Sequence, residues 1–140
     1  MNEAAKAGSA AKGLEAWHAI VRQPTEAALD ALLAEDVVFH SPVVHTPQRG
    51  PALAKLYLMG AFRVLAGQRP FRYVREIVGE RDALLEFETE IDGVLVNGVD
   101  LIRWNEAGRI VDFKVMLRPL KAIQTVQAQM AQMLEALKKA

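Results

Sequence analysis

Hydrophobic residues recur at helical spacing through the first half of the chain and at every second position in much of the second half. Leu14 and Trp17 belong to one apolar helical face, which Pro24 interrupts. A shorter helix is expected over residues 26–33, with Thr25 as its N-cap because a threonine hydroxyl can accept a hydrogen bond from a free backbone N–H. The chain therefore begins with two helices.

A short strand, a rigid loop and a third helix are expected next. Residues 37–41 form a compact apolar run that ends at a proline, which is typical of a strand, and residues 43–50 contain the proline and glycine of a loop. Pro51 suits the first position of a helix, because it lacks the backbone N–H that would remain unpaired there. We expect this helix over residues 51–65, closed by Gly67.

The alternating pattern of the second half predicts an antiparallel meander. Its four strands are expected over residues 71–78, 83–92, 94–104 and 109–117. In the second of them, Leu85 and Phe87 point to one face while Glu86 and Glu88 point to the other. One face of the sheet is therefore predicted to be core and the other to be wet.

A final amphipathic helix is expected over residues 120–140. Its apolar stripe could cover the sheet, close a pocket or pack on another subunit, and packing within its own fold is the favoured use.

Helices followed by a curved sheet that wraps back on them make a cone, whose open end is a natural apolar pocket. The predicted fold class is α+β, with N-terminal helices packed in a curved, mainly antiparallel sheet. We expect a flexible segment over residues 1–13 and a cone domain over residues 14–119, to which the last helix also belongs.

Composition narrows the possible functions. Seventeen basic residues balance seventeen acidic ones, which gives no reason to expect a nucleic acid or membrane partner. Cysteine is absent, which excludes disulfides, thiolate metal sites and a cysteine nucleophile. The sequence contains no run of membrane-spanning length and no signal-peptide core, so a cytoplasmic location is expected.

Asp100 is the most informative polar residue of the chain. Strand alternation places its carboxyl on the same face as Val96, Ile102 and Trp104, and burial of a carboxyl there is costly. Arg103 points to the opposite face of the same strand. Asp100 must therefore find hydrogen-bond donors, or carry a pKa raised enough to make it a neutral donor near pH 7. The alternative is that it reaches the rim of the sheet or caps a neighbouring backbone.

Three stretches carry a resemblance to a known family: residues 32–42, residues 49–50 and residues 100–110. With them the chain resembles the nuclear transport factor 2-like superfamily, and within it the SnoaL-like and ketosteroid-isomerase-like proteins, over residues 14–117. Such motifs are specific for the fold and poor indicators of function.

The resemblance implies a site like that of ketosteroid isomerase, where a neutral Asp and a Tyr hydroxyl hold an enolate oxygen and a second Asp moves the proton. Asp100 matches the oxyanion-hole Asp. Trp17 stands where that family carries its donor Tyr, and its indole N–H can also donate. Tyr57 matches a supporting Tyr. Ser41 stands where the proton-transferring Asp is expected, and a serine without a neighbouring base cannot take a proton at neutral pH, which argues against the steroid-isomerase reaction.

His45 is the candidate replacement base, because it lies in the loop expected to ring the pocket mouth and imidazole titrates near neutral pH. His40 lies on the opposite strand face from Ser41. A metal site built from these histidines with Glu35 or Asp36 matches no recognised ligand spacing, so neither a metal nor a cofactor is expected. The sequence also has no phosphate loop, no G-x-S-x-G elbow and no H-E-x-x-H motif. Gly98 stands where a related epoxide hydrolase site would need an Arg.

Two hypotheses from different classes remain. The first is the pocket of a ligand-binding protein, or of an isomerase- or cyclase-like enzyme, that holds a small apolar carbonyl or hydroxyl compound with Asp100 as hydrogen-bond donor. Its expected lining is Phe39, Ser41, Phe87, Ile102, Phe113, Val115 and Leu117. The second is a non-catalytic structural or interaction module with a filled pocket, whose outer sheet face, with Glu86 and Arg103, forms a homodimer. The ligand-binding hypothesis is favoured, because burial of a carboxyl on an apolar inner face is costly and a role in binding would account for it.

Overall fold

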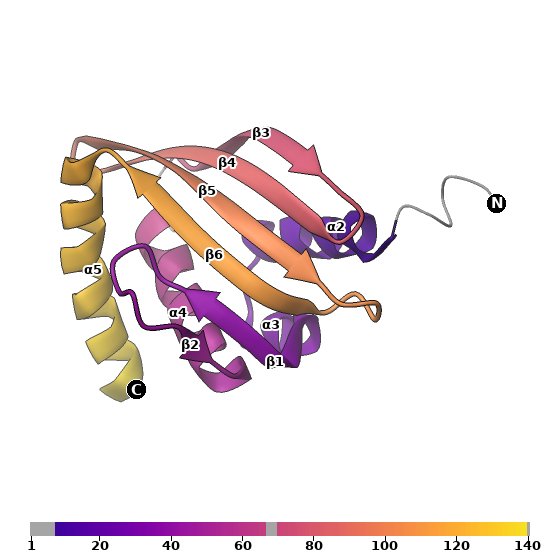
Figure 1. The fold of residues 1–140 in the computed structure, drawn as a ribbon. Helices are drawn as coiled ribbons and strands as arrows, with labels where there is room; N and C mark the ends of the chain where they lie inside the picture. The colour runs from indigo at the N-terminus through magenta and orange to yellow at the C-terminus, as the bar shows by residue number, and fades with distance from the viewer. Residues whose placement is uncertain (1–7, 67–69, 140) are drawn as a thin grey trace.

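The structure is a computed structural model that describes residues 8–66 and 70–139. Figure 1 shows a curved sheet with helices on one face and a last helix beside one end of the strands. The helices are α2 (Gly8–Arg22), α3 (Glu26–Leu32), α4 (Pro51–Ala61), the π-helical η1 (Phe62–Ala66) and α5 (Leu120–Lys139). The strands are β1 (Leu33–His40), β2 (Gln48–Arg49), β3 (Arg72–Val78), β4 (Asp82–Ile91), β5 (Val94–Trp104) and β6 (Ile110–Arg118).

The six strands form one sheet in the order β2-β1-β6-β5-β4-β3. The predicted meander from β3 to β6 is confirmed, since each of these strands pairs antiparallel with the next. Among the strands of residues 8–66 and 70–139, β1 is the one that departs from this pattern, because it returns beside β6 and pairs with it parallel. The fold class predicted from the sequence, helices packed in a curved and mainly antiparallel sheet, is therefore confirmed.

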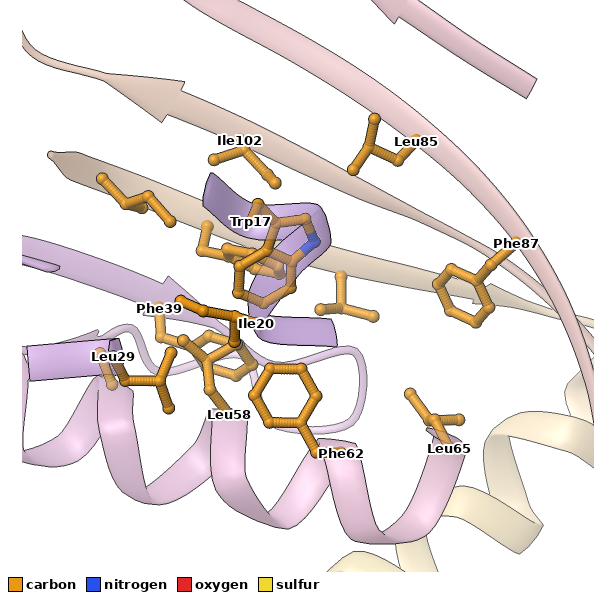
Figure 2. Packing of buried hydrophobic residues seen from close by; sticks show 14 of the residues in the cluster. Trp17, Ile20, Leu29, Phe39, Leu58, Phe62, Leu65, Leu85, Phe87 and Ile102 are labelled. Carbon is orange, nitrogen blue, oxygen red and sulfur yellow. The ribbon is translucent and has the colours of Figure 1, made fainter. Parts of the chain in front are cut away.

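The core lies between the concave face of the sheet and helices α2, α3 and α4 (Figure 1). Figure 2 shows the Trp17 indole of α2 between strand residues Ile102 and Leu85 and the helix residues Leu58 and Phe62. All five side chains are buried. Alternation of apolar and polar residues predicts this face correctly because the pleat sends every second side chain inward.

The first helix begins earlier than expected. The sequence predicts a flexible segment that includes residues 8–13, but these residues form the first turns of α2, where Ala10 is fully buried. Gly13 lies against the indole of Trp104, and a Cβ atom added at Gly13 would lie 2.1 Å from Nε1 of that indole. Small residues that look featureless in the sequence therefore allow the helix to approach the sheet closely. Residues 1–7 lie outside the described part of the chain.

The ends of some helices and strands follow the local sequence pattern, and the start of one strand does not. Thr25 caps α3, its Oγ1 accepting a hydrogen bond from the backbone N–H of Ala28 at 3.1 Å. Asp92 and Gly93 both have positive φ, as a two-residue hairpin turn requires. Strand β1 is expected to begin at residue 37 but begins at Leu33. Its first residues were missed because the pairing of β1 with β6 is irregular between Leu33 and Val38, which interrupts the alternation of buried and exposed residues.

Two further predictions concern helices. The third helix follows the expected course to residue 65 but changes to π-helical winding at Phe62, and its expected terminator Gly67 lies outside the described residues. Among the helices that the structure describes, none combines the length and apolar character needed to cross a membrane.

Candidate functional site

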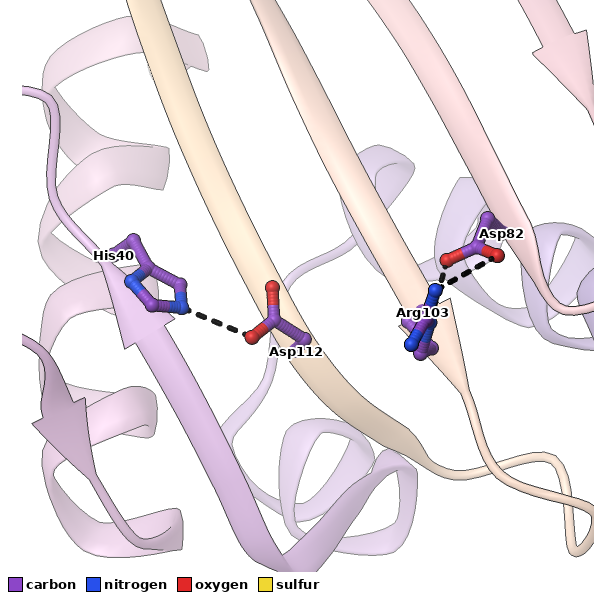
Figure 3. A network of polar contacts seen from close by, with 4 residues as sticks. All are labelled: His40, Asp82, Arg103 and Asp112. Carbon is purple, nitrogen blue, oxygen red and sulfur yellow. Dashed lines mark hydrogen bonds and ion pairs between the residues drawn. The ribbon is translucent and has the colours of Figure 1, made fainter.

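Asp100 lies on the inner face of β5, as predicted, with only 6% of its surface exposed. Its cross-strand neighbours are Leu85 of β4 and Val115 of β6, and both are apolar and buried. Arg103 does point to the other face, where its Nε donates to Asp82 Oδ1 at 2.8 Å (Figure 3). Asp100 is therefore a buried acid whose nearest cation in sequence is engaged elsewhere.

Tyr73 of β3 is the residue that satisfies this carboxyl. Its hydroxyl donates to Asp100 Oδ2 across 2.6 Å. The same hydroxyl accepts a hydrogen bond from Trp17 Nε1 at 3.0 Å. Three elements, α2, β3 and β5, thus supply one chain of hydrogen bonds from Trp17 through Tyr73 to Asp100.

The curvature of the sheet brings Tyr73 to Asp100 even though β4 lies between their strands. A concave face tilts the side chains of its outer strands toward the middle, and a long phenol ring covers the remaining distance. The pairing of β3 with β4 also shifts register between Tyr73 and Arg75, and such bulges change the direction in which a side chain points. Tyr73 can therefore contact a residue two strands away.

A small cavity lies beside this pair. Its volume is about 30 Å³, enough for one or two water molecules. Apart from Asp100 and Tyr73, the described lining is almost wholly apolar: Trp17, Val21, Leu58, Ala61, Phe62, Leu65, Ala66, Phe71, Phe87, Phe113 and Val115. The π-helical turn η1 contributes part of this wall, and π-helical turns occur frequently at functional sites.

Burial determines the electrostatics of the pair. Removal from water raises the pKa of Asp100 to about 7, and the hydrogen bond from Tyr73 partly opposes this shift because it stabilises the carboxylate. Burial and the negative charge of Asp100 raise the pKa of Tyr73 well above its ordinary value. Near neutral pH, Asp100 is consequently present in both forms while Tyr73 keeps its proton.

The structure gathers five of the predicted site residues around the cavity: Asp100, Trp17, Phe87, Phe113 and Val115. Phe39 and Tyr57, expected at the same site, instead contact each other, with ring centroids 5.5 Å apart. Ile102 is fully buried in the core. None of these last three is among the described residues that line the cavity.

Ser41 and His45 lie in a different place from Asp100. With Leu117 they line an open hollow where the loop after β1 meets β6. Ser41 Oγ accepts a hydrogen bond from the backbone N–H of Val43 at 3.2 Å. His40 pairs with Asp112 on the outer sheet face, Nε2 to Oδ1 at 2.9 Å (Figure 3). Of the described residues that line the cavity, Asp100 and Tyr73 are therefore the ones that can titrate.

Two further observations concern the histidines. His18 pairs with Glu76, its Nε2 lying 2.7 Å from Oε2. Within residues 8–66 and 70–139, no three histidine or acidic side chains are grouped closely enough to hold a metal ion.

Tyr73 was missed in the sequence for a physical reason. Its strand gives a weak alternation because β3 is an edge strand whose residues are mostly exposed. The available signal was that Phe71 and Tyr73 share a face, and that a buried acid on a nearby strand needs a donor. Knowing which tyrosine supplies that donor requires the pairing register of three strands and the curvature of the sheet.

Comparison with known proteins agrees with this architecture. The family model of the SnoaL-like domain matches residues 14–113. The chain belongs to the SnoaL-like domain family. Its place in the nuclear transport factor 2-like superfamily, inferred above by resemblance, is thereby confirmed. No curated protein matches the chain in sequence.

Solved structures of this SnoaL-like protein's relatives include two at 32% identity. One is a steroid delta-isomerase from Pseudomonas aeruginosa, with a TM-score of 0.87 over 94% of this chain and 96% of the other. The second is an uncharacterised bacterial protein with a cystatin-like fold from Silicibacter pomeroyi, with a TM-score of 0.78 over 86% and 83%. A putative SnoaL-like polyketide cyclase from Jannaschia, at 9% identity and a TM-score of 0.66 over 84% and 93%, shares the fold alone.

Proposed function

We propose that this SnoaL-like protein binds a small, largely apolar compound and contacts its carbonyl or hydroxyl oxygen through Asp100. The observation that supports this proposal most strongly is the Tyr73–Asp100 pair at the wall of an apolar cavity. A buried carboxyl costs several kcal/mol of desolvation that a leucine of similar size would avoid. Such a group is typical of a binding site, where it gives an apolar ligand one specific polar contact.

The size of the cavity limits how a ligand enters. The cavity volume of about 30 Å³ is well below the roughly 150 Å³ of a protein cavity that takes up benzene, so the walls are proposed to move when a ring compound binds. The cavity lining includes Phe62 and Leu65 of η1 and Phe71, which directly precedes β3, and these are the side chains that we propose turn aside. Binding therefore exchanges contacts within the core for contacts with the ligand.

An isomerase- or cyclase-like reaction on a carbonyl compound is the second candidate function. It is favoured by the similarity to a steroid delta-isomerase over nearly the whole chain. In that reaction neutral Asp100 would stabilise an enolate oxygen by donating a hydrogen bond. A second group must then move the proton, and Ser41 lies outside the described cavity lining. We therefore place ligand binding ahead of isomerisation.

Homodimer formation through the outer sheet face is compatible with both functions. Leu95 and Met116 lie on that face and are 73% and 46% exposed. If the cavity stayed filled by its own side chains, the protein would act instead as an interaction module. A binding experiment separates these two possibilities.

The direct test is calorimetric titration of 2-indanone, a compact apolar ketone, into wild type and Asp100→Leu. The proposal expects saturable binding to wild type at pH 6 and a loss of at least ten-fold in affinity in the variant, about the free energy of one hydrogen bond. Thermal unfolding of Asp100→Leu verifies that it is folded. Equal affinity of both proteins for the ketone would contradict a contact with Asp100.

A further inference from the structure

We infer that Trp17 and Tyr73 are positioning residues that leave Asp100 Oδ1 as the one polar contact that the described lining offers the ligand, which makes the site selective for carbonyl compounds when Asp100 is neutral. This inference rests on the proposed function. The direction of the hydrogen bonds from Trp17 through Tyr73 to Asp100 can be tested in the ligand-free protein.

The direction of the hydrogen-bond chain follows from the chemistry of its first member. An indole N–H can only donate. The Tyr73 oxygen must therefore accept from Trp17, and the one proton of the phenol remains for Asp100 Oδ2, 2.6 Å away. This separation is within the range of a strong O–H···O⁻ hydrogen bond. The Tyr73 hydroxyl is thus engaged on both sides and has no proton to offer a ligand.

The two carboxyl oxygens consequently have different roles. Oδ2 accepts from Tyr73, so the proton of neutral Asp100 belongs on Oδ1, and Asp100 lines the cavity. Neutral Asp100 then presents one O–H donor to the cavity, suited to a ketone or aldehyde oxygen. Ionised Asp100 presents only an acceptor, which a carbonyl cannot use but a hydroxyl can.

The described residues packed directly around Asp100 are largely apolar. On β4 and β6 the neighbours of Asp100 are Leu85 and Val115, and η1 contributes Phe62 to the same cavity. From α2, His18 lies near Tyr73 with ring centroids 5.6 Å apart, and its Nε2 lies 2.7 Å from Oε2 of Glu76 on β3. The negative charge of Glu76 adds to the burial and the Asp100 charge that raise the pKa of Tyr73. Asp100, with a pKa of about 7, is therefore the group that changes the character of the site near neutral pH.

The ligand test compares 2-indanone with 2-indanol, which have the same ring system and differ in the oxygen group. Between pH 5.5 and pH 8.5, we expect ketone affinity for wild type to fall roughly thirty-fold, as the neutral fraction of a group with a pKa of about 7 falls. The alcohol can donate or accept and should keep its affinity within a few-fold. Equal pH profiles for the two compounds would show that Asp100 does not select between them.

Two variants separate the role of Asp100 from that of Tyr73. Asp100→Asn can donate to the ligand through its amide and still accept from Tyr73, so it should bind the ketone equally at both pH values. Tyr73→Phe should keep ketone binding at pH 5.5. If Tyr73→Phe instead loses binding as fully as Asp100→Leu, the phenol contacts the ligand and the inference is wrong.

The ligand-free test is the pH titration of the Asp100 carboxyl carbon by ¹³C NMR. Tyr73 donates to the carboxylate and stabilises it, so Tyr73→Phe should raise the titration midpoint. Trp17→Phe should raise it by less, because the phenol then becomes a weaker donor. A lowered midpoint in Tyr73→Phe would mean that Asp100 donates to Tyr73 and would overturn the inference.

The second tryptophan of the chain supplies a matched control. Trp104 is fully buried like Trp17, but its Nε1 has no hydrogen-bond partner among the described residues. Trp104→Phe should therefore cost similar packing while leaving the Asp100 midpoint unchanged. A wild type that binds neither probe would contradict the proposed function, whereas the direction of the hydrogen-bond chain would still be decided by these titrations.

Discussion

A single buried carboxyl makes the stability of this protein depend on pH in an unusual direction. The pKa of Asp100 is about 7 in the folded chain, against an ordinary value near 4. Between these values the folded chain keeps a proton that the unfolded chain has lost. The contribution of Asp100 to stability is therefore full below about pH 4 and is lost as the pH rises toward 7.

Urea denaturation of wild type and Asp100→Asn can measure this dependence. We expect the free energy of unfolding of wild type, relative to the variant, to fall by roughly 3 kcal/mol between pH 5 and pH 8. The amide does not titrate, so the difference between the two proteins isolates Asp100. Parallel stability profiles would contradict a raised pKa at this position.

The sequence was informative about residues whose environment is local. The burial of Asp100 and the outward direction of Arg103 follow from strand alternation, and both are confirmed. The contact between Asp100 and Tyr73 depends on strand order, register and curvature together, none of which can be derived from neighbouring residues. Trp17 was predicted to donate a hydrogen bond to a ligand oxygen, whereas in the structure its indole N–H donates to the Tyr73 hydroxyl.

At the scale of elements, two helical glycines allow a direct comparison of close packing. A Cβ atom at Gly13 of α2 would lie 2.1 Å from Trp104 Nε1, whereas at Gly60 of α4 it would lie 3.2 Å from the flexible end of Met130. Alanine favours helix over glycine by about 1 kcal/mol at both positions. The atoms that surround each glycine therefore determine whether its replacement by alanine stabilises or destabilises the protein.

We expect Gly13→Ala to lower the free energy of unfolding by about 1–3 kcal/mol, because the helix must move away from the sheet. Gly60→Ala should be nearly neutral or slightly stabilising, since the methionine end can shift. Thermal and urea unfolding of the two variants provides the measurement. Equal effects would mean that α2 does not pack on Trp104 as closely as described.

Most helices and strands were predictable, because turns and periodicity are encoded locally. Thr25 and the Asp92-Gly93 turn are examples in which the side chain or the backbone conformation determines the boundary. The π-helical turn η1 and the parallel placement of β1 were not predictable, because both depend on packing between distant segments. The early start of α2 belongs to the same class, since Gly13 is favourable there only because Trp104 lies opposite.

At the scale of the whole molecule, the two faces of the sheet have separate roles in our proposal. The inner face holds the cavity, and the outer face is proposed to pair with a second copy of the chain. Met116→Glu places a charge among the exposed apolar residues of the outer face. It should convert a dimer to a monomer in sedimentation velocity while leaving 2-indanone affinity within two-fold.

The matched control for this variant is Leu53→Glu. Leu53 is also a partly exposed apolar residue, at 41%, but it lies on α4 rather than on the sheet. This variant should not change the oligomeric state. A monomeric wild type at micromolar concentration would contradict the proposed dimer without affecting the account of the cavity.

The contact between Asp100 and a ligand oxygen is tested most directly by the ¹³C NMR spectrum of 2-indanone labelled at its carbonyl carbon. At pH 5.5 we expect the bound carbonyl resonance to move downfield in wild type and Asp100→Asn, because a hydrogen bond withdraws electron density from that carbon. In Asp100→Leu the resonance should stay near its position in an apolar solvent. The same downfield shift in all three proteins, or none in wild type, would contradict a hydrogen bond from Asp100 to the ligand.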